Sequence, residues 1–401
     1  MKNFNLEEVL EKYKDNRDVI SLFSGAMGLD IGLEKAGLNV VIGQDFESSC
    51  VETMKANGHD VLGGDIREIS PEMLLELTGL HTGEPFMICG GPPCQPFSTA
   101  GKRLGINDPR GSLFMDFIRM IDYIRPRFFV MENVKGIVSS PLKHVSTKER
   151  VKDDPEQKLG TVLDVILCEF NKLGYKTVYG ILDAVNYGVP QFRERFVLIG
   201  SRDNEDIFLP VPTHFQMHQN PDYRWKTVGE AIRDLESTPG EYTPLSGDRK
   251  KYLHMVPEGG NWRDLPQEII PVAMGGAYES GGGKVGFYRR LSYAQPSPTI
   301  TTSPAQKATM LCHPKQDRPL SIKEYARIQQ FPDDWKFTGT ISAQYRQIGN
   351  AVPIGLAEAI GRAIISTANK TSTIETKRFR GTSVHNRIKN AMELGGNLYG
   401  D

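Results

Sequence analysis

The chain has 401 residues, 39% of them hydrophobic and 24% charged, with a formal net charge of −1. This composition is that of a soluble globular protein, and the length suffices for two domains. We find no apolar run long enough to cross a membrane and no secretory signal, which indicates a cytoplasmic protein. The near-neutral charge excludes a globally basic nucleic-acid-binding protein, although a local basic cleft would suffice to contact phosphates.

The cysteines also indicate a cytoplasmic protein. There are five of them, and none forms a C-x-x-C pair. This pattern argues against a zinc site or a disulfide framework and is typical of a reducing compartment. We therefore predict no metal.

Strand patterns and helix patterns alternate in the first part of the chain. Apolar strand patterns cover 18–23, 39–45, 61–65, 86–91, 128–134, 176–184 and 195–201. Helix patterns cover 29–37, 112–124 and 161–174. Strands alternating with helices of this length indicate βαβ units. We therefore predict an α/β fold, with a Rossmann-like, doubly wound and mostly parallel sheet.

The composition and the periodicity of the sequence change after Ser201. Prolines, glycines and aromatics crowd residues 202–320, and helical periodicity is sparse there. This predicts a second, smaller and irregular domain. Regular helix patterns return later in the chain, and the last residues are polar. The predicted division is 1–200 for the first domain, 201–341 for the second, 342–368 for a segment returning to the first, and 369–401 for a polar tail.

The first loop, FSGAMG at 23–28, joins the first predicted strand to the first predicted helix. Its glycines let the backbone approach a ligand at the helix N-terminus. Asp45 follows Gly25 at the spacing expected for a ribose hydroxyl partner. The G-x-G-x-x-G fingerprint is absent. On these residues alone, a nucleoside ligand and a glycine turn that serves packing both remain open.

Cys94 and Glu132 each follow an apolar run, in GGPPCQPFS and FFVMENV. The carboxyl ends of parallel strands open onto one crevice, so a thiol and a carboxyl group would face the same ligand. The prolines around Cys94 place it in a rigid loop. A carboxyl group buried like Glu132 can stay protonated and act as a hydrogen-bond donor. Alternatively, Cys94 is a small buried hydrophobic residue, and Glu132 is a surface carboxylate at the end of a strand.

QFRERF places Arg193 and Arg195 two residues apart, hence on one face of an extended segment. They form either a fork of donors for a carbonyl, carboxylate or phosphate, or a pair of exposed arginines on an edge strand. RRLSYAQPSPTITTSP, 289–304, is either a proline-rich loop or a basic edge that follows a phosphate backbone.

Taken together and in this order, these segments resemble the DNA (cytosine-5) methyltransferases, of the bacterial restriction-modification type. The resemblance covers Asp18 to Ile365, apart from a variable region at 202–288. It implies a methyltransferase fold that binds S-adenosylmethionine, and a second domain that recognises the target. One departure is Met27, which stands where the family commonly has a glycine. The implied cofactor-binding residues are Phe23, Ser24, Gly25, Gly28, Leu29, Asp45, Phe46, Asp65, Ile66, Pro93, Asn350 and Ala351.

The resemblance also implies a mechanism and a substrate. A cytosine is flipped out of a short sequence in double-stranded DNA, and the Cys94 thiolate adds to its carbon 6. Glu132 then serves ring N3, Arg195 holds O2, and Arg193 supports the loop. The methyl group passes to carbon 5. The implied DNA-contacting residues are Gln95, Ser98, Arg289, Arg290 and Thr301.

A monomer in a bacterial or phage context is expected, with a cognate restriction endonuclease acting separately. Three alternatives remain open. The chain could be an RNA (cytosine-5) methyltransferase, but that branch lacks a large recognition region and carries a Cys-Phe-Thr segment not found here. It could be a non-catalytic, methyltransferase-like module that binds nucleic acid, but such modules tend to lose the cysteine or the acid. A nicotinamide dehydrogenase is the third alternative, and the missing fingerprint disfavours it.

Overall fold

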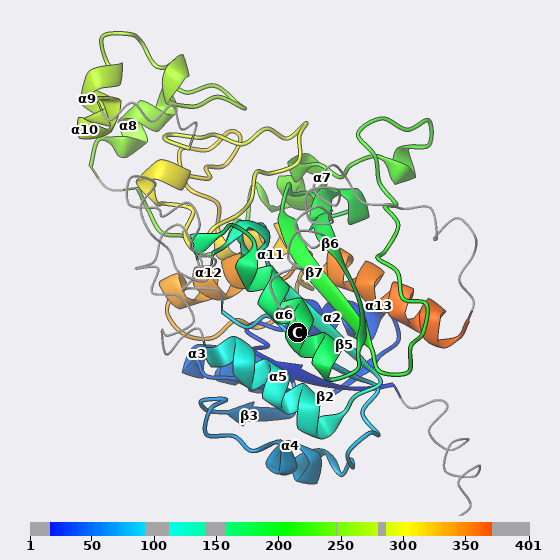
Figure 1. Cartoon of the computed structure of the whole chain (residues 1–401). Helices are drawn as coiled ribbons and strands as arrows, with labels where there is room; N and C mark the ends of the chain where they lie inside the picture. The colour runs from blue at the N-terminus through cyan, green and yellow to red at the C-terminus, as the bar shows by residue number, and fades with distance from the viewer. Residues whose placement is uncertain (1–16, 94–111, 142–156, 246, 280–285, 371–401) are drawn as a thin grey trace, which may run out of the picture.

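The computed structural model describes residues 17–93, 112–141, 157–245, 247–279 and 286–370. Its centre is a seven-stranded sheet with the order β3-β2-β1-β4-β5-β7-β6 (Figure 1). β7 runs antiparallel to both of its neighbours, and the other paired strands are parallel. The predicted mostly parallel sheet is confirmed. The strands are β1 (Asp18–Leu22), β2 (Asn39–Asp45), β3 (Val61–Gly63), β4 (Met87–Gly90), β5 (Phe128–Val134), β6 (Lys176–Asp183) and β7 (Glu194–Ser201).

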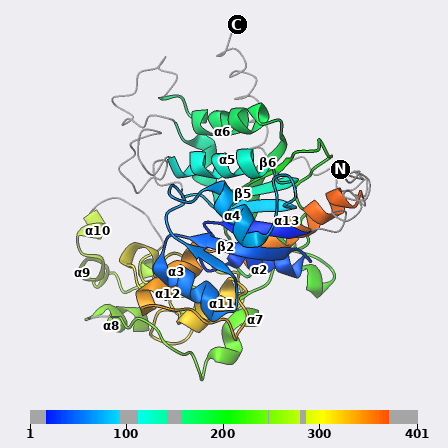
Figure 2. The ribbon, with the colours of Figure 1, turned by 90° about the horizontal axis from the view of Figure 1, so that it is seen from below.

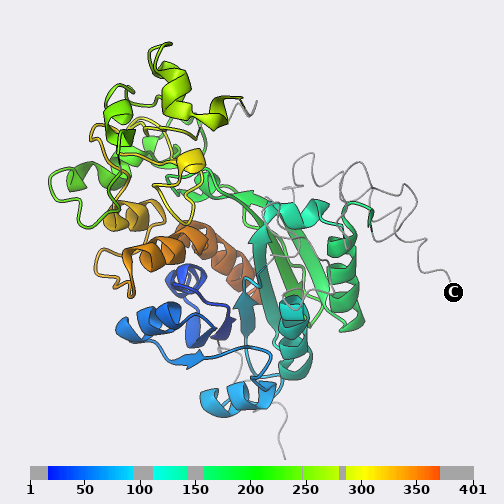
Figure 3. The same cartoon turned by 90° about the vertical axis from the view of Figure 1, so that its left-hand side faces the viewer.

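Helices cover both faces of this sheet (Figure 3). One face packs against α4 (Pro71–Thr78), α5 (Ser112–Ile124) and α6 (Thr161–Lys172), with Phe117 and Phe170 fully buried. The other face packs against α2 (Gly28–Lys35) and α13 (Ile354–Ala368). The result is a three-layer sandwich with an apolar core on each side of the sheet.

The C-terminal segment returns to the first helix. A β-carbon at Gly32 would lie 2.3 Å from the β-carbon of Ala357, so only glycine lets α2 and α13 approach this closely. The apolar stretch Ile341–Ala368 is long enough to cross a membrane by composition, but 67% of its most apolar window is buried inside the protein. It comprises α12 (Ile341–Asn350) and α13, so core packing accounts for its hydrophobicity.

The predicted second domain, 201–341, contains short helices joined by irregular segments. α8 (Arg249–His254), α9 (Ile270–Met274) and α10 (Gly276–Glu279) lie far from the sheet (Figure 1). They share a small core that includes Leu253 and Cys312. α7 (Val228–Ile232) and α11 (Ile322–Ile328) instead pack with α12 and α3 (Ser48–Ala56), and Figure 2 shows α3, α11 and α12 grouped beside α2. The proposed 201–341 domain thus contains two packing units.

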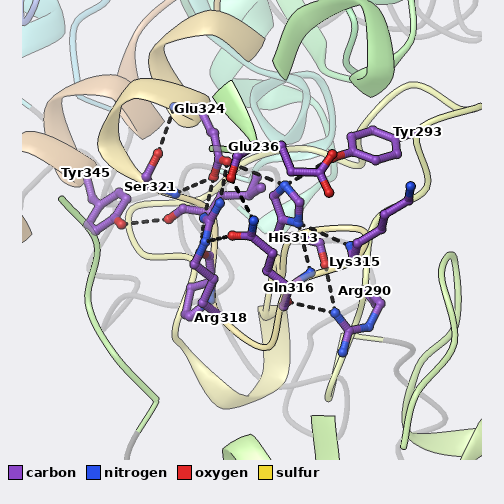
Figure 4. A network of polar contacts seen from close by, with 12 residues as sticks. Glu236, Arg290, Tyr293, His313, Lys315, Gln316, Arg318, Ser321, Glu324 and Tyr345 are labelled. Carbon is purple, nitrogen blue, oxygen red and sulfur yellow. Dashed lines mark hydrogen bonds and ion pairs between the residues drawn. The ribbon is translucent and has the colours of Figure 1, made fainter. Parts of the chain in front are cut away.

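A buried polar network ties these two units together (Figure 4). Arg318 donates two hydrogen bonds of 2.7 Å to the carboxylate of Glu324, and both side chains are buried. His313 lies beside them, with Nε2 3.7 Å from Glu324 Oε1 and 3.2 Å from the Tyr293 hydroxyl. Buried ion pairs persist only when their remaining polar atoms are satisfied, so this network favours one fixed arrangement of the segments it joins.

Candidate active site

A cavity of about 710 Å³ opens at the carboxyl ends of the central strands. Every predicted cofactor-binding residue lines it, although these residues come from the first loop, the start of α2, the end of β2, the segment after β3, the loop after β4 and the end of α12. Glu132, Arg193 and Arg195 line the same cavity. The size is within the range of small-molecule sites. The fold therefore gathers residues more than 300 positions apart around one ligand-sized space.

The first loop owes its shape to left-handed backbone conformations. Phe23, Gly25 and Met27 have φ angles of 55°, 57° and 66°. A left-handed non-glycine residue costs about 1–2 kcal/mol. Met27 offsets that cost by burying its whole side chain in the core shared with α3, α11 and α12. Methionine thus adopts the turn that the family commonly builds with glycine.

Two acids, Asp45 and Asp65, line one part of the cavity. Asp45 accepts hydrogen bonds of 2.8 Å from the backbone amides of Gly25 and Glu47, while burial raises the pKa of its carboxyl group. Asp65 pairs with Arg67, whose hydrogen bonds lower the pKa of Asp65. Phe46, at the rim, is 67% exposed, leaving its ring free to contact a ligand. Asp45 therefore closes the loop and also lines the cavity.

Glu132 is buried, with 8% of the residue exposed. Burial raises the pKa of its carboxyl group, and Arg195 and Arg193 oppose that shift. Arg195 Nε lies 2.7 Å from Glu132 Oε1. The register of β5 against β7 explains this proximity, because Arg195 pairs with Val134, two residues beyond Glu132 on the same face. The amide of Asn133 donates to Pro92 O at 3.0 Å and so anchors the loop after β4 beside the acid.

Arg193 has a different position from Arg195. It is 1% exposed, and its guanidinium donates to the backbone oxygens of Ile300, Gly349 and Ala351 at 2.9, 2.6 and 3.1 Å. The interpretation as exposed edge arginines is wrong, because β7 lies between β5 and β6 and both side chains are largely buried. Arg193 joins β7 to the 289–304 segment and to the end of α12.

The structure describes only some of the residues predicted to be the nucleophile or to contact DNA. Cys94, Gln95 and Ser98 lie outside the described residues, and the described segment ends at Pro93 on the cavity wall. Arg289 is half-buried, and burial lowers its pKa. Thr301 Oγ1 donates to Ser303 O at 3.1 Å.

Arg290 does not have the position expected of a DNA contact. It is 4% exposed, and its guanidinium is fully engaged within the protein, donating to the backbone oxygens of Leu253, Val256, His313 and Gln316 and to Asp317. We therefore revise its expected role. A buried guanidinium needs partners for its five donors, and here four backbone carbonyls and the Asp317 carboxylate supply them.

The cavity-lining residues that were not predicted from the sequence include Asp30 and Arg346. An acid in the first turn of a helix is common, because the helix dipole favours it there, so Asp30 carries no distinguishing signal. Arg346 lies on a polar helix, 3.9 Å from Glu47, and nothing in its local sequence marks it.

The order of the strands and the cavity at their carboxyl ends define the class of protein, an α/β methyltransferase fold. An Escherichia coli protein described as a prophage-encoded DNA modification methyltransferase shares this fold, with a TM-score of 0.58 at 22% identity over 88% of this chain and 99% of that chain. The methyltransferase EhMeth of Entamoeba histolytica gives a TM-score of 0.56 at 18% identity, over 90% and 100% of the two chains.

The sequence comparisons define the family. A family model described as C-5 cytosine-specific DNA methylase matches residues 17–366. The type II methyltransferase M.Sau96I of Staphylococcus aureus is 38% identical over 374 residues, which cover 92% of this chain and 81% of the relative. M.PspPI of Psychrobacter is 39% identical over 90% and 82% of the two chains. The chain belongs to the C-5 cytosine-specific DNA methylase family, and this excludes the dehydrogenase alternative.

Proposed function

We propose that this protein transfers a methyl group from S-adenosylmethionine to carbon 5 of a cytosine in double-stranded DNA. One observation carries the proposal: the cavity that collects the predicted nucleoside-binding residues also contains the buried Glu132–Arg195 pair. A nucleoside cofactor and a target base would therefore share one space. The loop leading to Cys94 begins on the wall of that space, at Pro92 and Pro93.

The residues present fit the cofactor. Asp45 and Asp65 offer carboxylates to a nucleoside, Phe23 and Phe46 offer rings, and Asp30 has buried oxygens with no partner among the described residues. Ser24, Gly25, Gly28 and Leu29 would hold the amino-acid end, and Ile66, Pro93, Asn350 and Ala351 would complete the wall. When bound, S-adenosylmethionine supplies an electrophilic methyl group on a sulfonium.

The chain's own residues would activate the base. The Cys94 thiolate adds to carbon 6 of cytosine, which makes carbon 5 nucleophilic. Glu132 in its protonated form donates to N3, and its raised pKa favours retention of that proton. Arg195 donates to O2 and stabilises the developing charge. After methylation, a water molecule takes the carbon 5 proton, and elimination of the thiolate restores the double bond of the base and frees Cys94. Arg193 would support the geometry of the site through its hydrogen bonds to the backbone oxygens of Ile300 and Gly349.

The target base reaches this site only if it leaves the DNA stack, at a cost of a few kcal/mol. The irregular domain, within 201–341, would recognise the sequence, and Gln95, Ser98, Arg289 and Thr301 would contact DNA. The relatives are named type II methyltransferases. We accordingly propose a monomeric bacterial or phage enzyme that protects DNA from a separate restriction endonuclease.

Expression in a bacterial host that lacks cytosine methylation tests this proposal. Bisulfite conversion should reveal 5-methylcytosine at one short motif across the genome, and Cys94→Ala should abolish it while leaving cofactor binding intact. DNA without 5-methylcytosine, from cells containing soluble protein that binds S-adenosylmethionine, would contradict the proposal. Methylated RNA from those cells would then identify the RNA alternative, and its absence would identify a non-catalytic module.

A further inference from the structure

Asp30 differs from the other acids around the cavity because nothing in the described chain neutralises it. It lies in the first turn of α2, is fully buried and lines the cavity. Neither of its carboxylate oxygens has a hydrogen-bond partner among the described residues. Its charged neighbour is another acid, Asp45, and no cation of the described chain stabilises it.

This arrangement is costly for the protein alone. Burial raises the pKa of Asp30 to about 6, although the Ser21 hydroxyl and the backbone amide of Asp30 itself act in the opposite direction. The charge of Asp30 in turn adds to the effect of burial on Glu34, whose pKa rises to about 7, and on Cys89 of β4, whose pKa also rises. His59 Nδ1 lies 3.9 Å from Glu34 Oε1. A buried, unpaired carboxylate that costs stability in the free protein is typical of a ligand site.

The backbone beside Asp30 has the opposite polarity. No side chain caps the start of α2, and Gly28 and Leu29 line the cavity there. The first amides of a helix have no intrahelical partner and favour anionic groups. One end of the cavity therefore presents amide donors for a carboxylate next to an unsatisfied carboxylate, the pattern that fits an amino acid in its zwitterionic form.

We propose that Asp30 binds the α-ammonium group of the methionine part of the cofactor, while the first turn of α2 faces its carboxylate. The inference rests on the proposed function. The cofactor has two cationic groups, the α-ammonium and the sulfonium. The two carboxylate oxygens of Asp30 that lack a hydrogen-bond partner favour the ammonium group. An ammonium group brings three N–H donors that satisfy them, whereas a sulfonium group brings none.

Isothermal titration calorimetry with three probes tests the assignment. S-adenosylmethionine and S-adenosylhomocysteine both carry the ammonium group, and 5′-methylthioadenosine lacks the amino-acid end. Asp30→Asn should weaken binding of the first two by the same factor, about tenfold or more, and leave the third unchanged. Glu34→Gln is the matched control, because Glu34 lies on the same helix but does not line the cavity, and it should change none of the three.

Each other outcome has a definite meaning. A loss confined to S-adenosylmethionine would assign Asp30 to the sulfonium, and an equal loss for all three probes, or none, would also overturn the proposal. Without ligand, Asp30→Asn should unfold at the same or a higher denaturant concentration, because it removes an unpaired buried charge; a less stable or unfolded variant would show a structural role instead. Wild-type protein that binds none of the probes would refute the proposed function rather than this inference.

Discussion

Arg195 Nε lies 2.7 Å from Oε1 of Glu132, and the two side chains are only 11% and 10% exposed. Arg193 adds a second buried guanidinium whose charge also acts on Glu132. Two arginines thus flank one acid in the wall of the cavity. Because electrostatic interactions strengthen away from water, a base entering this site would meet preorganised donors.

Removal of the acid should separate binding from catalysis. Glu132→Gln keeps the shape of the side chain but cannot give a proton to ring N3. We expect turnover to fall by roughly 10²- to 10⁴-fold, the usual contribution of a general acid, while S-adenosylmethionine affinity stays unchanged. Single-turnover methylation of a duplex, together with calorimetry, measures both quantities. Glu194→Gln, an exposed neighbour paired with Lys135, is the control and should leave turnover unchanged. Equal rates for wild type and Glu132→Gln would refute the role.

The strands of the sheet could be predicted from the sequence because their signal is local. Predicted segments 39–45 and 128–134 coincide with β2 and β5, since continuous apolar runs mark strands buried on both faces. α3 and α4 were not predicted. The buried residues of α3 are Cys50, Val51, Thr53 and Met54, and the rest of the helix is polar or charged. The apolar periodicity of α3 is therefore weak.

The roles of individual arginines could not be predicted, because their partners are distant in the sequence. Arg193 bonds to carbonyls 107 to 158 residues away, and Arg290 to carbonyls 23 to 37 residues away on both sides. Contacts between residues so far apart in the sequence cannot be predicted from the local spacing of residues. The two arginines of QFRERF could be assigned to one face, but which of them meets the acid depends on the antiparallel register of β5 and β7.

Met27 allows backbone strain to be weighed against burial. Met27→Gly relieves about 1–2 kcal/mol of left-handed strain but removes a fully buried side chain, a loss of about 2–5 kcal/mol. Burial should prevail, so both Met27→Gly and Met27→Ala should lower the free energy of unfolding. The alanine variant should be the less stable by about 1 kcal/mol, because it keeps the strain. Urea denaturation measures this order, and a glycine variant more stable than wild type would contradict it.

Two helices with the same capping pattern allow a matched test of the buried network. Glu230 of α7 and Glu324 of α11 each complete a capping box, but only Glu324 also forms a buried pair with Arg318. Glu324→Gln should cost about 3–5 kcal/mol, because it leaves a guanidinium buried without its counter-charge. Glu230→Gln should cost less than about 1 kcal/mol, since its pair with Lys226 is exposed. Similar losses in both variants would show that the capping box, rather than the ion pair, stabilises α11.

His313 should make the protein sensitive to acid. Its Nδ1 accepts hydrogen bonds from the backbone amides of Lys315 and Gln316 at 3.1 and 3.0 Å, an arrangement that requires an unprotonated Nδ1. Burial and the neighbouring charge of Arg318 lower its pKa from 6.5 to about 4. The unfolded chain therefore binds this proton more readily than the folded chain. The stabilisation is complete above about pH 6.5 and is lost as the pH falls towards 4.

His313→Gln isolates this contribution. The variant should be less stable than wild type at neutral pH, because it loses the two amide bonds and the contact with Tyr293. Its free energy of unfolding should also fall less steeply between pH 6.5 and 4, since glutamine takes up no proton. Asp30 acts in the opposite sense in the lower part of this range, because its raised pKa makes the folded chain the better proton acceptor there. Urea titrations of wild type, His313→Gln and Asp30→Asn across this range resolve the two terms. Parallel pH profiles for wild type and His313→Gln would show that folding does not lower the pKa of His313.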